Sequence, residues 1–450
     1  MVHGLIGIRL LHPGAASRII GVVRPAVRDG NAPVFLTLAL SLAVPFGGIG
    51  LVVAGSVGMI LASRFRIARD ALKLYASPWV RSDAFALNLL VLVVTLIELG
   101  LLLYHHDKTS EFENQLKQYG MALAILLTIR RYSPAVLIWG AAIGCLLACA
   151  VAAKDVFLDH LPRAMGPTNS IRFGMIAALF SMYCLVGAAF LRGSGLARLL
   201  LVLCGLAGLF AVLASGSRGA VLALPPALLL LVPHLWHRSR RMAMIGAALL
   251  VSLSAGLAIW QVNAFRNETI GFREVVAAIV SGKLVEDRSD RNRAEMLLLS
   301  ARLFKDHPLL GVGTVGWLRA VEAQRKSSEP KNKLGEVFNQ PHNQYANDLV
   351  KGGLVRGLGG LAMLILPLYC FAIRHPFRPA RSSLAPLLGL TTCVTFATFS
   401  FTESVMDLSL TSSLYVIVIF YLMAASEGAP LDTPRHGKGR EATARPPAEG

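Results

Sequence analysis

The chain has 450 residues, of which 54% are hydrophobic and only 16% charged, and its mean hydropathy is +0.58. A soluble fold of this length could not hide so much apolar surface from water, so these values exclude an ordinary cytosolic enzyme. Apolar runs of about 18 or more residues, long enough to cross a hydrocarbon layer of ~30 Å, recur along the chain. They do not alternate as the strands of a membrane β-barrel do. We therefore expect an all-α, polytopic integral membrane protein.

The apolar runs, taken in chain order, predict about twelve transmembrane helices, at 33–45, 47–62, 84–104, 114–129, 134–153, 172–192, 196–214, 219–235, 242–261, 350–373, 384–400 and 408–425. Only the turn signal Pro45-Phe46-Gly47-Gly48 separates the first two, and the fourth has a polar N-terminal half. The resulting organisation is an N-terminal segment at 1–32, helices at 33–261, one large loop at 262–341, helices at 342–425 and a disordered, Pro- and Gly-rich tail at 426–450.

The basic residues predict the topology. Lys and Arg number 44 against 26 Asp and Glu, a formal net charge of +18. The short loops on one side of the predicted helices carry 23 Lys and Arg, and those on the other side carry six: Lys108, Lys117, Lys154, Arg163, Arg172 and Arg218. The positive-inside rule therefore places both termini in the cytoplasm and the large loop on the outer face. No basic stripe interleaved with aromatic residues supports a nucleic-acid partner.

Several chemistries are not supported. All six cysteines fall in apolar runs, which indicates neither a disulfide framework nor a thiolate metal site. The first 30 residues lack the apolar core and cleavage site of a removable signal peptide. No HExxH, Walker loop, GxSxG or His/Cys cluster occurs. Glu98 is the only acid expected well inside a span, whereas a proton-coupled transporter usually has several. The first outer loop, at Gly47-Gly48, leaves no room for an acidic pair, so we expect no catalytic metal.

A first candidate site is Arg218, in Ser215-Gly216-Ser217-Arg218-Gly219 at the predicted outer boundary of two spans. Its planar guanidinium can bind phosphate oxygens at the depth of the headgroups. The alternative is an interfacial arginine whose side chain merely extends toward water.

The large loop contains a second candidate. Residues 288–304 are expected to form a helix that ends before Pro308, followed by a turn with Gly311, Gly313 and Gly316. If Ser289 or Asp290 caps this helix, Arg291 and Arg293 lie in its first turn, where backbone N–H groups also favour an anion. Residues two apart on a helix point about 200° apart, so at most one of the two arginines faces a given ligand. The alternative is a solvated basic helix start.

The third candidate is His342, in Pro341-His342-Asn343-Gln344-Tyr345, just before the long span that contains Gly352-Gly353. A helix N-terminus disfavours imidazolium, so the ring would stay neutral near pH 7 and could accept a proton. The alternatives are a capping or interface histidine. His307, in a His-Pro turn, is expected to be structural.

These motifs together resemble the O-antigen ligase and polymerase superfamily. The resemblance rests on Arg293 with His307 in Asp-His-Pro-Leu-Leu-Gly-Val-Gly, on His342-Asn343 with Tyr345, and on Ser217-Arg218-Gly219 upstream. It covers about 215–360 by motif and most of the chain by topology. One departure is Leu297, where many members have Trp.

The resemblance implies a GT-C-like enzyme of the bacterial inner membrane that transfers O-antigen glycan from undecaprenyl diphosphate to a sugar hydroxyl of lipid A-core oligosaccharide, on the periplasmic face and without a cofactor. On that reading His342 is the general base, and Arg218 and Arg293, with Arg291 in reserve, bind the diphosphate. Supporting or structural roles fall to Ser217, Asn343, Tyr345, His307, Gly311 and Gly313.

Two other functions remain open. The polymerase of the same superfamily extends an undecaprenyl-linked chain, and an Arg-x10-Gly spacing at Arg302 to Gly313 fits its pattern, although about one such match is expected by chance. A second outer loop of matching size is absent from the predicted topology, which favours the ligase. The alternative of a different class is a transporter or flippase of lipid-linked glycan, for which His342 would be dispensable.

Overall fold

The computed structural model describes residues 31–43, 83–128, 132–191, 194–233, 288–326, 338–374 and 384–427. Within these ranges every regular element is a helix, as the composition predicts. The elements are α2 (Ala32–Leu40), α5 (Asp83–His105), α6 (Ser110–Thr128), α7 (Pro134–Ala153), the π-helical turn η2 (Lys154–Leu158), α8 (Ser170–Phe190), α9 (Gly195–Ser215), α10 (Arg218–Leu222), α11 (Leu224–Leu229), α15 (Arg288–Asp306), α16 (Gly313–Lys326), α17 (Gln344–Arg374), α18 (Leu384–Phe399) and α19 (Ser409–Glu427).

Six helices of the described chain are long and apolar enough to cross a membrane: α5, α7 with η2, α8, α9, α17 and α19. Each coincides with a predicted span, which agrees with a polytopic membrane protein. α18 is a shorter apolar helix at the place of another. The total of twelve spans and the GT-C-like assignment stay predictions, because the expected spans at 47–62 and 242–261 and most of both terminal segments lie outside the described residues.

Three predicted spans differ from the structure. The described part of the first, α2, has nine residues, about 14 Å of helix, which is too short to cross a bilayer. In α6 the polar side chains of Asn114, Gln115 and Gln118 are buried, and Asn114 donates to the carbonyl of Met406, in the α18–α19 connection, at 3.3 Å. The described part of the span at 219–235 is divided into α10 and α11, because Pro225 and Pro226 have no N–H to continue the helix.

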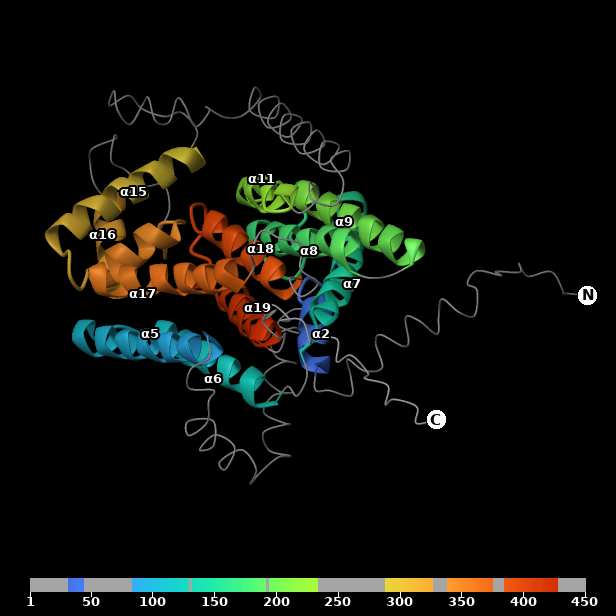
Figure 1. The fold of residues 1–450 in the computed structure, drawn as a ribbon. Coiled ribbons are helices and arrows are strands. Elements are labelled where there is room, and N and C mark those ends of the chain that lie inside the picture. The colour runs from blue at the N-terminus through green and yellow to red at the C-terminus, as the bar shows by residue number, and fades with distance from the viewer. Residues whose placement is uncertain are drawn as a thin grey trace, which may run out of the picture.

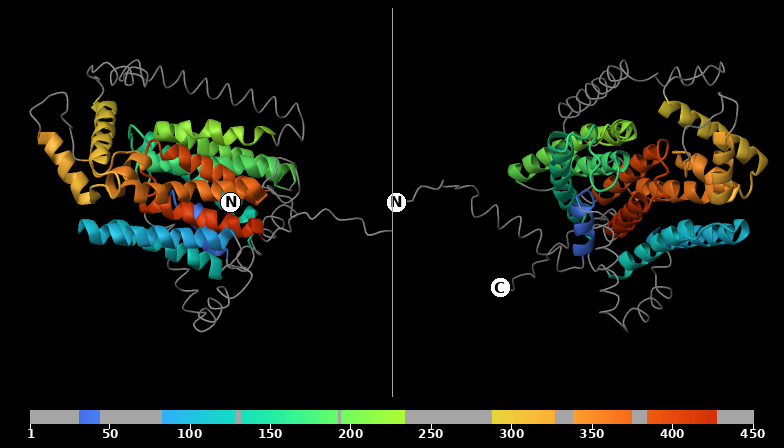
Figure 2. Two further views of the ribbon diagram at one scale, coloured as in Figure 1. Left: turned by 60° about the vertical axis from the view of Figure 1, so that its left-hand side comes forward. Right: turned by 180° about the vertical axis from the view of Figure 1, so that it is seen from behind.

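The helices form two groups around a central layer (Figure 1). α7, α8 and α9 pack together on one side, α5 and α6 lie on the other, and α17, α18 and α19 lie between them. α8 and α19 are the most buried of the candidate spans. α15 and α16, from the large loop, lie at one end of the bundle (Figure 2).

α17 is not one straight helix. Gly353, at φ +62° and ψ −156°, interrupts it, a backbone conformation that only glycine adopts readily. Asp348 and Gly360 would be about 18 Å apart along a continuous helix. Instead, a Cβ atom at Gly360 would lie 2.3 Å from Oδ2 of Asp348. The segment 344–352 is therefore a short arm that folds back on the longer segment 354–374.

The turn after α15 stabilises this break. The carbonyls of Pro308 and Leu309 accept the N–H groups of Leu354 and Val355, at 2.8 and 3.2 Å, and the Val312 N–H donates to Val350 at 2.9 Å. Both helix ends created by the break thus find hydrogen-bond partners. Gly311 has φ +66°, and a Cβ atom there would lie 2.5 Å from the Lys351 carbonyl carbon. The close approach of these two backbones explains why residues 311 and 353 are glycines.

The loop helices have a small core of their own, which packs on Val350 of the arm: Met296, Leu299, Trp317 and Val321. α15 confirms the predicted helix at 288–304, although Ser289 and Asp290 lie within it and neither is its cap. α16 was not predicted. Its first N–H groups, of Thr314 and Val315, donate to the Asp107 carboxylate at 2.7 and 2.8 Å, so a residue of the α5–α6 connection provides its cap.

Candidate functional site

His342 lies immediately before α17. The side chain of Asn343 caps this helix by accepting the Ala346 N–H at 3.0 Å, so the predicted helix N-terminus is present at this position. His342 itself has φ +52°, a left-handed conformation that is uncommon for residues other than glycine. Its side chain is 25% exposed. A strained and partly accessible histidine is a reason to look for function here.

Glu403, in the connection between α18 and α19, is the partner of His342. Its Oε1 atom lies 3.0 Å from Nδ1 of His342, and Oε2 lies 3.2 Å from the same nitrogen. The carboxylate also accepts the Gln340 side-chain amide at 2.8 Å and the Ser404 N–H at 3.0 Å. Glu403 is only 2% exposed, so these contacts replace the water that a carboxylate needs.

The charge of Glu403 is held in place by its neighbours. Burial alone would raise the pKa of this carboxyl, but the hydrogen bond and charge of His342, the Ser404 N–H and the charge of Arg172 outweigh burial and lower the pKa below its ordinary value of 4.5. A buried carboxylate therefore stays ionised beside the imidazole.

This pair fixes how the imidazole can act. Nδ1–H donates to Glu403, so the lone pair of neutral His342 is on Nε2, which has no hydrogen-bond partner among the described residues. The edge of the ring also packs on Phe338, with centroids 5.8 Å apart. A carboxylate that orients a histidine and stabilises its protonated form is the arrangement of a general base.

The Ser217-Arg218-Gly219 segment lies against the same connection. Ser217 caps the short helix α10, accepting the Ala220 N–H at 3.4 Å. A Cβ atom at Gly219 would lie 2.1 Å from Oγ1 of Thr402, the residue before Glu403. Arg218 is half-buried and follows Ser217 directly. The structure thus brings the segment of Arg218 and the His342–Glu403 pair together, although about 120 residues separate them in the sequence.

The other predicted site residues are placed differently. Tyr345 donates to the Ala397 carbonyl at 2.9 Å and its ring packs on Phe401, so it anchors the arm. His307, Gly311 and Gly313 form the turn at the far end of the arm, about 12 Å from His342 by its length. The half-buried Arg293 makes no hydrogen bond or ion pair with described residues, and the side chain of Arg291 lies outside them.

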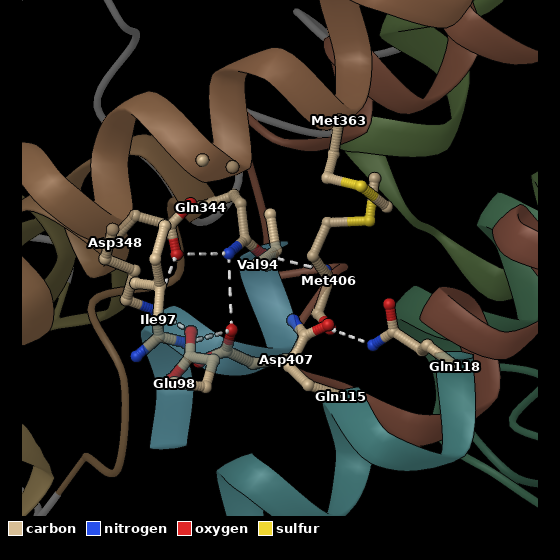
Figure 3. A pocket seen from close by; sticks show the side chains of 13 residues that line it. Val94, Ile97, Glu98, Gln115, Gln118, Gln344, Asp348, Met363, Met406 and Asp407 are labelled. Carbon is tan, nitrogen blue, oxygen red and sulfur yellow. Dashed lines mark hydrogen bonds and ion pairs between the residues drawn. The ribbon is translucent and has the colours of Figure 1, made fainter. Parts of the chain in front are cut away.

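A buried ion network surrounds Arg356, and Figure 3 shows three of its carboxylates, Glu98, Asp348 and Asp407. The guanidinium of Arg356 lies among four carboxylates, at 3.0 Å from Glu98, 2.7 Å from Glu111, 2.8 Å from Asp407 and 3.3 Å from Asp348. A second cation, Lys351, lies 2.7 Å from Glu111 and 3.5 Å from Asp407. The expectation that Glu98 is the only acid deep in a span is corrected, because the folded-back arm brings Asp348 beside it.

The network connects the two segments that carry the pair. Asp407 accepts the side-chain amides of Gln344 at 3.3 Å and Asn347 at 2.6 Å, both on the arm that begins after His342. Asp407 itself follows Glu403 by four residues in the α18–α19 connection. The network therefore fixes the position of the segment that carries His342 relative to the segment that carries Glu403.

Sequence reasoning missed Glu403 and most of this network. The available signal was weak: Glu403 and Asp407 are isolated acids between two apolar runs. Only the fold shows that they face His342 and Arg356. No group of three or more His, Cys, Asp or Glu side chains in the described ranges is arranged as a metal site. That catalysis needs no metal stays a prediction.

Fold and site together define a class: a helical membrane protein with a carboxylate–histidine pair and an arginine segment at one end of its bundle. The family model described as O-antigen ligase matches residues 199–359, a stretch that includes Arg218, Arg293 and His342. This match supports the resemblance of the chain to the O-antigen ligase and polymerase superfamily, a group of glycosyltransferase-like enzymes. No curated protein matches the chain.

Proposed function

We propose that the protein is an O-antigen ligase. It would transfer O-antigen polysaccharide from undecaprenyl diphosphate to a sugar hydroxyl of lipid A-core oligosaccharide, which completes lipopolysaccharide. The observation that carries this proposal is the contact of His342 with Glu403, next to the segment of Arg218. Such a site can combine a base for a hydroxyl group with a cation for a diphosphate.

In this mechanism, Nε2 of His342 removes the proton of the acceptor hydroxyl as its oxygen attacks the anomeric carbon of the donor sugar. A new glycosidic bond forms, the bond between that carbon and the diphosphate oxygen breaks, and the electron pair leaves with undecaprenyl diphosphate. Glu403 stabilises the imidazolium that results. Arg218 neutralises the charge that builds on the leaving group, with Arg293 or Arg291 as further candidates.

The expected location follows from the topology. The connections that charge counting assigns to the outer face contact one another at one end of the bundle: His105 donates to the Leu310 carbonyl at 2.8 Å, His342 binds Glu403, and Gly219 contacts Thr402. This grouping supports a site on the periplasmic face of the bacterial inner membrane, with both termini in the cytoplasm.

The polymerase is the second candidate, because the family match supports the ligase and polymerase superfamily without separating the two activities. It would use the same base and leaving group but a different acceptor, the undecaprenyl-linked chain itself. A transporter of lipid-linked glycan would need neither a base nor an acceptor.

The test is transfer by the purified full chain, supplied with undecaprenyl diphosphate-linked O-antigen and lipid A-core and with no ion gradient or nucleotide. We expect wild type to form lipopolysaccharide and His342→Ala and Arg218→Ala to lose at least about 10²-fold in rate. His106→Ala is the matched control, because His106 is exposed and has the same φ of +52°. Extension of the undecaprenyl-linked chain alone would establish the polymerase, and absence of any transfer by wild type would contradict both.

A further inference from the structure

Arg172 lies in the first turn of α8, where its own N–H donates to the capping side chain of Asn169 at 2.9 Å. Its side chain is half-buried, and Nε is buried with no hydrogen-bond partner among the described residues. Its positive charge acts on the Glu403 carboxylate, yet no ion pair joins the two. Arg172 is therefore close to the candidate base pair without being bound by it.

This placement is unfavourable for stability alone. A cation in the first turn of a helix opposes the positive end of the helix dipole. A buried donor without a partner also costs free energy, because water no longer solvates it. An anion at this position would relieve both costs. Arginines that oppose local stability in this way commonly serve a ligand.

A second arginine lies beside the same structural unit. α8 packs on the turn between α9 and α10 and on the start of α10, where a Cβ atom at Gly219 would lie 3.1 Å from Cε of Met175. Met175 is three residues after Arg172 and lies on the same face of α8. In this turn, a Cβ atom at Gly216 would lie 3.4 Å from Nε of Arg163. Arg163 is exposed, and its side chain has no ion-pair partner in the described chain. Arg163, Arg172 and Arg218 thus approach one turn from three chain segments.

We propose that Arg172, together with Arg163, forms with Arg218 the site that binds the diphosphate of a polyprenyl diphosphate donor. This inference rests on the proposed function, whose diphosphate-binding residues were assigned from Arg218, Arg293 and Arg291. Gly219 contacts Thr402, the residue before Glu403, so a diphosphate held at this turn would lie close to the segment that carries the partner of His342. The site replaces Arg293 as the principal partner of Arg218, because Arg293 lies on α15, which packs on α16 and α17, whereas Arg163 and α8 lie beside the turn that Arg218 follows.

The experiment measures binding as well as activity. Wild type, Arg172→Gln, Arg172→Lys and Arg163→Gln are purified as full chains in detergent, and folding is checked by size exclusion and thermal unfolding. Affinity is measured for undecaprenyl diphosphate, for inorganic pyrophosphate and for nanodiscs of phosphatidylglycerol. Arg319→Gln is the matched control, because Arg319 is an exposed arginine of α16.

We expect Arg172→Gln to weaken undecaprenyl diphosphate binding about 10- to 100-fold, the loss of one charged contact, with a smaller loss for Arg172→Lys and Arg163→Gln. A similar loss of affinity for pyrophosphate supports a site that binds the phosphate groups themselves. Equal affinity of Arg172→Gln and wild type overturns the inference, as does an equal loss for phosphatidylglycerol or for Arg319→Gln. If wild type binds the diphosphate through Arg172 yet transfers no glycan, the proposed function fails and the binding site stands.

Discussion

The Nδ1 atom of His342 lies 3.0 Å from Oε1 of Glu403, although 61 residues separate the two in the chain. One residue precedes the folded-back arm of α17 and the other lies between α18 and α19. Asp407 connects these segments, because it binds the arm through Asn347 and follows Glu403 in the same connection. The pair is therefore positioned by tertiary contacts on both sides, and Nε2 is the nitrogen available to a substrate.

Glu403→Gln should lower the rate of glycan transfer by about 10²-fold, because the amide cannot stabilise the imidazolium as a carboxylate does. The rate is measured at saturating donor and acceptor. In the His342→Ala background, the same substitution should cause little further loss, since both residues act in one step. Glu322→Gln, at a partly exposed acid on α16, is the control. Independent, multiplying effects of the two substitutions would disprove the pairing.

The stability of the protein should depend on pH through Glu403. Because the pKa of this carboxyl is lower in the folded protein than its ordinary value of 4.5, the carboxylate stabilises the fold above that value, and the contribution is lost as pH falls through the folded pKa. We expect the wild-type unfolding temperature to fall between about pH 5 and pH 3 more steeply than that of Glu403→Gln. Parallel pH profiles of the two proteins would contradict this assignment.

Gly353→Ala should destabilise the fold by about 2–4 kcal/mol. A side chain at φ +62° is strained, and its Cβ atom would lie 2.2 Å from the Leu309 carbonyl carbon. The measurement is thermal or denaturant unfolding in detergent. Gly359→Ala is the matched control, because the nearest atom to its Cβ, on Val94, is 3.4 Å away. Similar stabilities of the two variants would rule out the proposed role of the break.

Arg356→Leu should be more damaging than removal of an exposed ion pair. It leaves four carboxylates with Lys351 as the one nearby cation among the described residues, and an uncompensated buried charge costs about 3–5 kcal/mol. Arg325→Ala, which breaks a surface pair with Glu322 at 2.9 Å, should have a much smaller effect, because water and salt screen such pairs. Both values come from unfolding of the purified variants. A small effect of Arg356→Leu would show that the network does not hold α17 in place.

Transfer activity should survive excess EDTA. A diphosphate is a competent leaving group, and fixed arginines can supply the positive charge that a divalent ion supplies in other transferases. The comparison is the initial rate of transfer before and after chelation, followed by addition of Mg²⁺. Loss of activity that Mg²⁺ restores would contradict the metal-independent mechanism.

Much of the architecture follows from local sequence patterns. Long apolar runs such as that of α5 predict membrane helices, because backbone polar groups in lipid must bond within the segment. The helix at 288–304 was evident from its boundary before Pro308. His342 could be placed at a helix N-terminus for the same reason, since Asn343 is a capping residue and the apolar pattern follows it.

The composition of the site was decided by tertiary structure. Glu403 and Arg172 have no recognisable sequence pattern around them. The sequence near a single acid or arginine between apolar runs is the same whether or not that residue faces a histidine. The glycines at Gly352-Gly353 were visible, but not that the chain folds back there and brings Asp348 to Arg356. Sequence determined which segments become helices through short-range backbone bonding, and only long-range packing determined which charged side chains meet, because those contacts join residues tens to hundreds of positions apart.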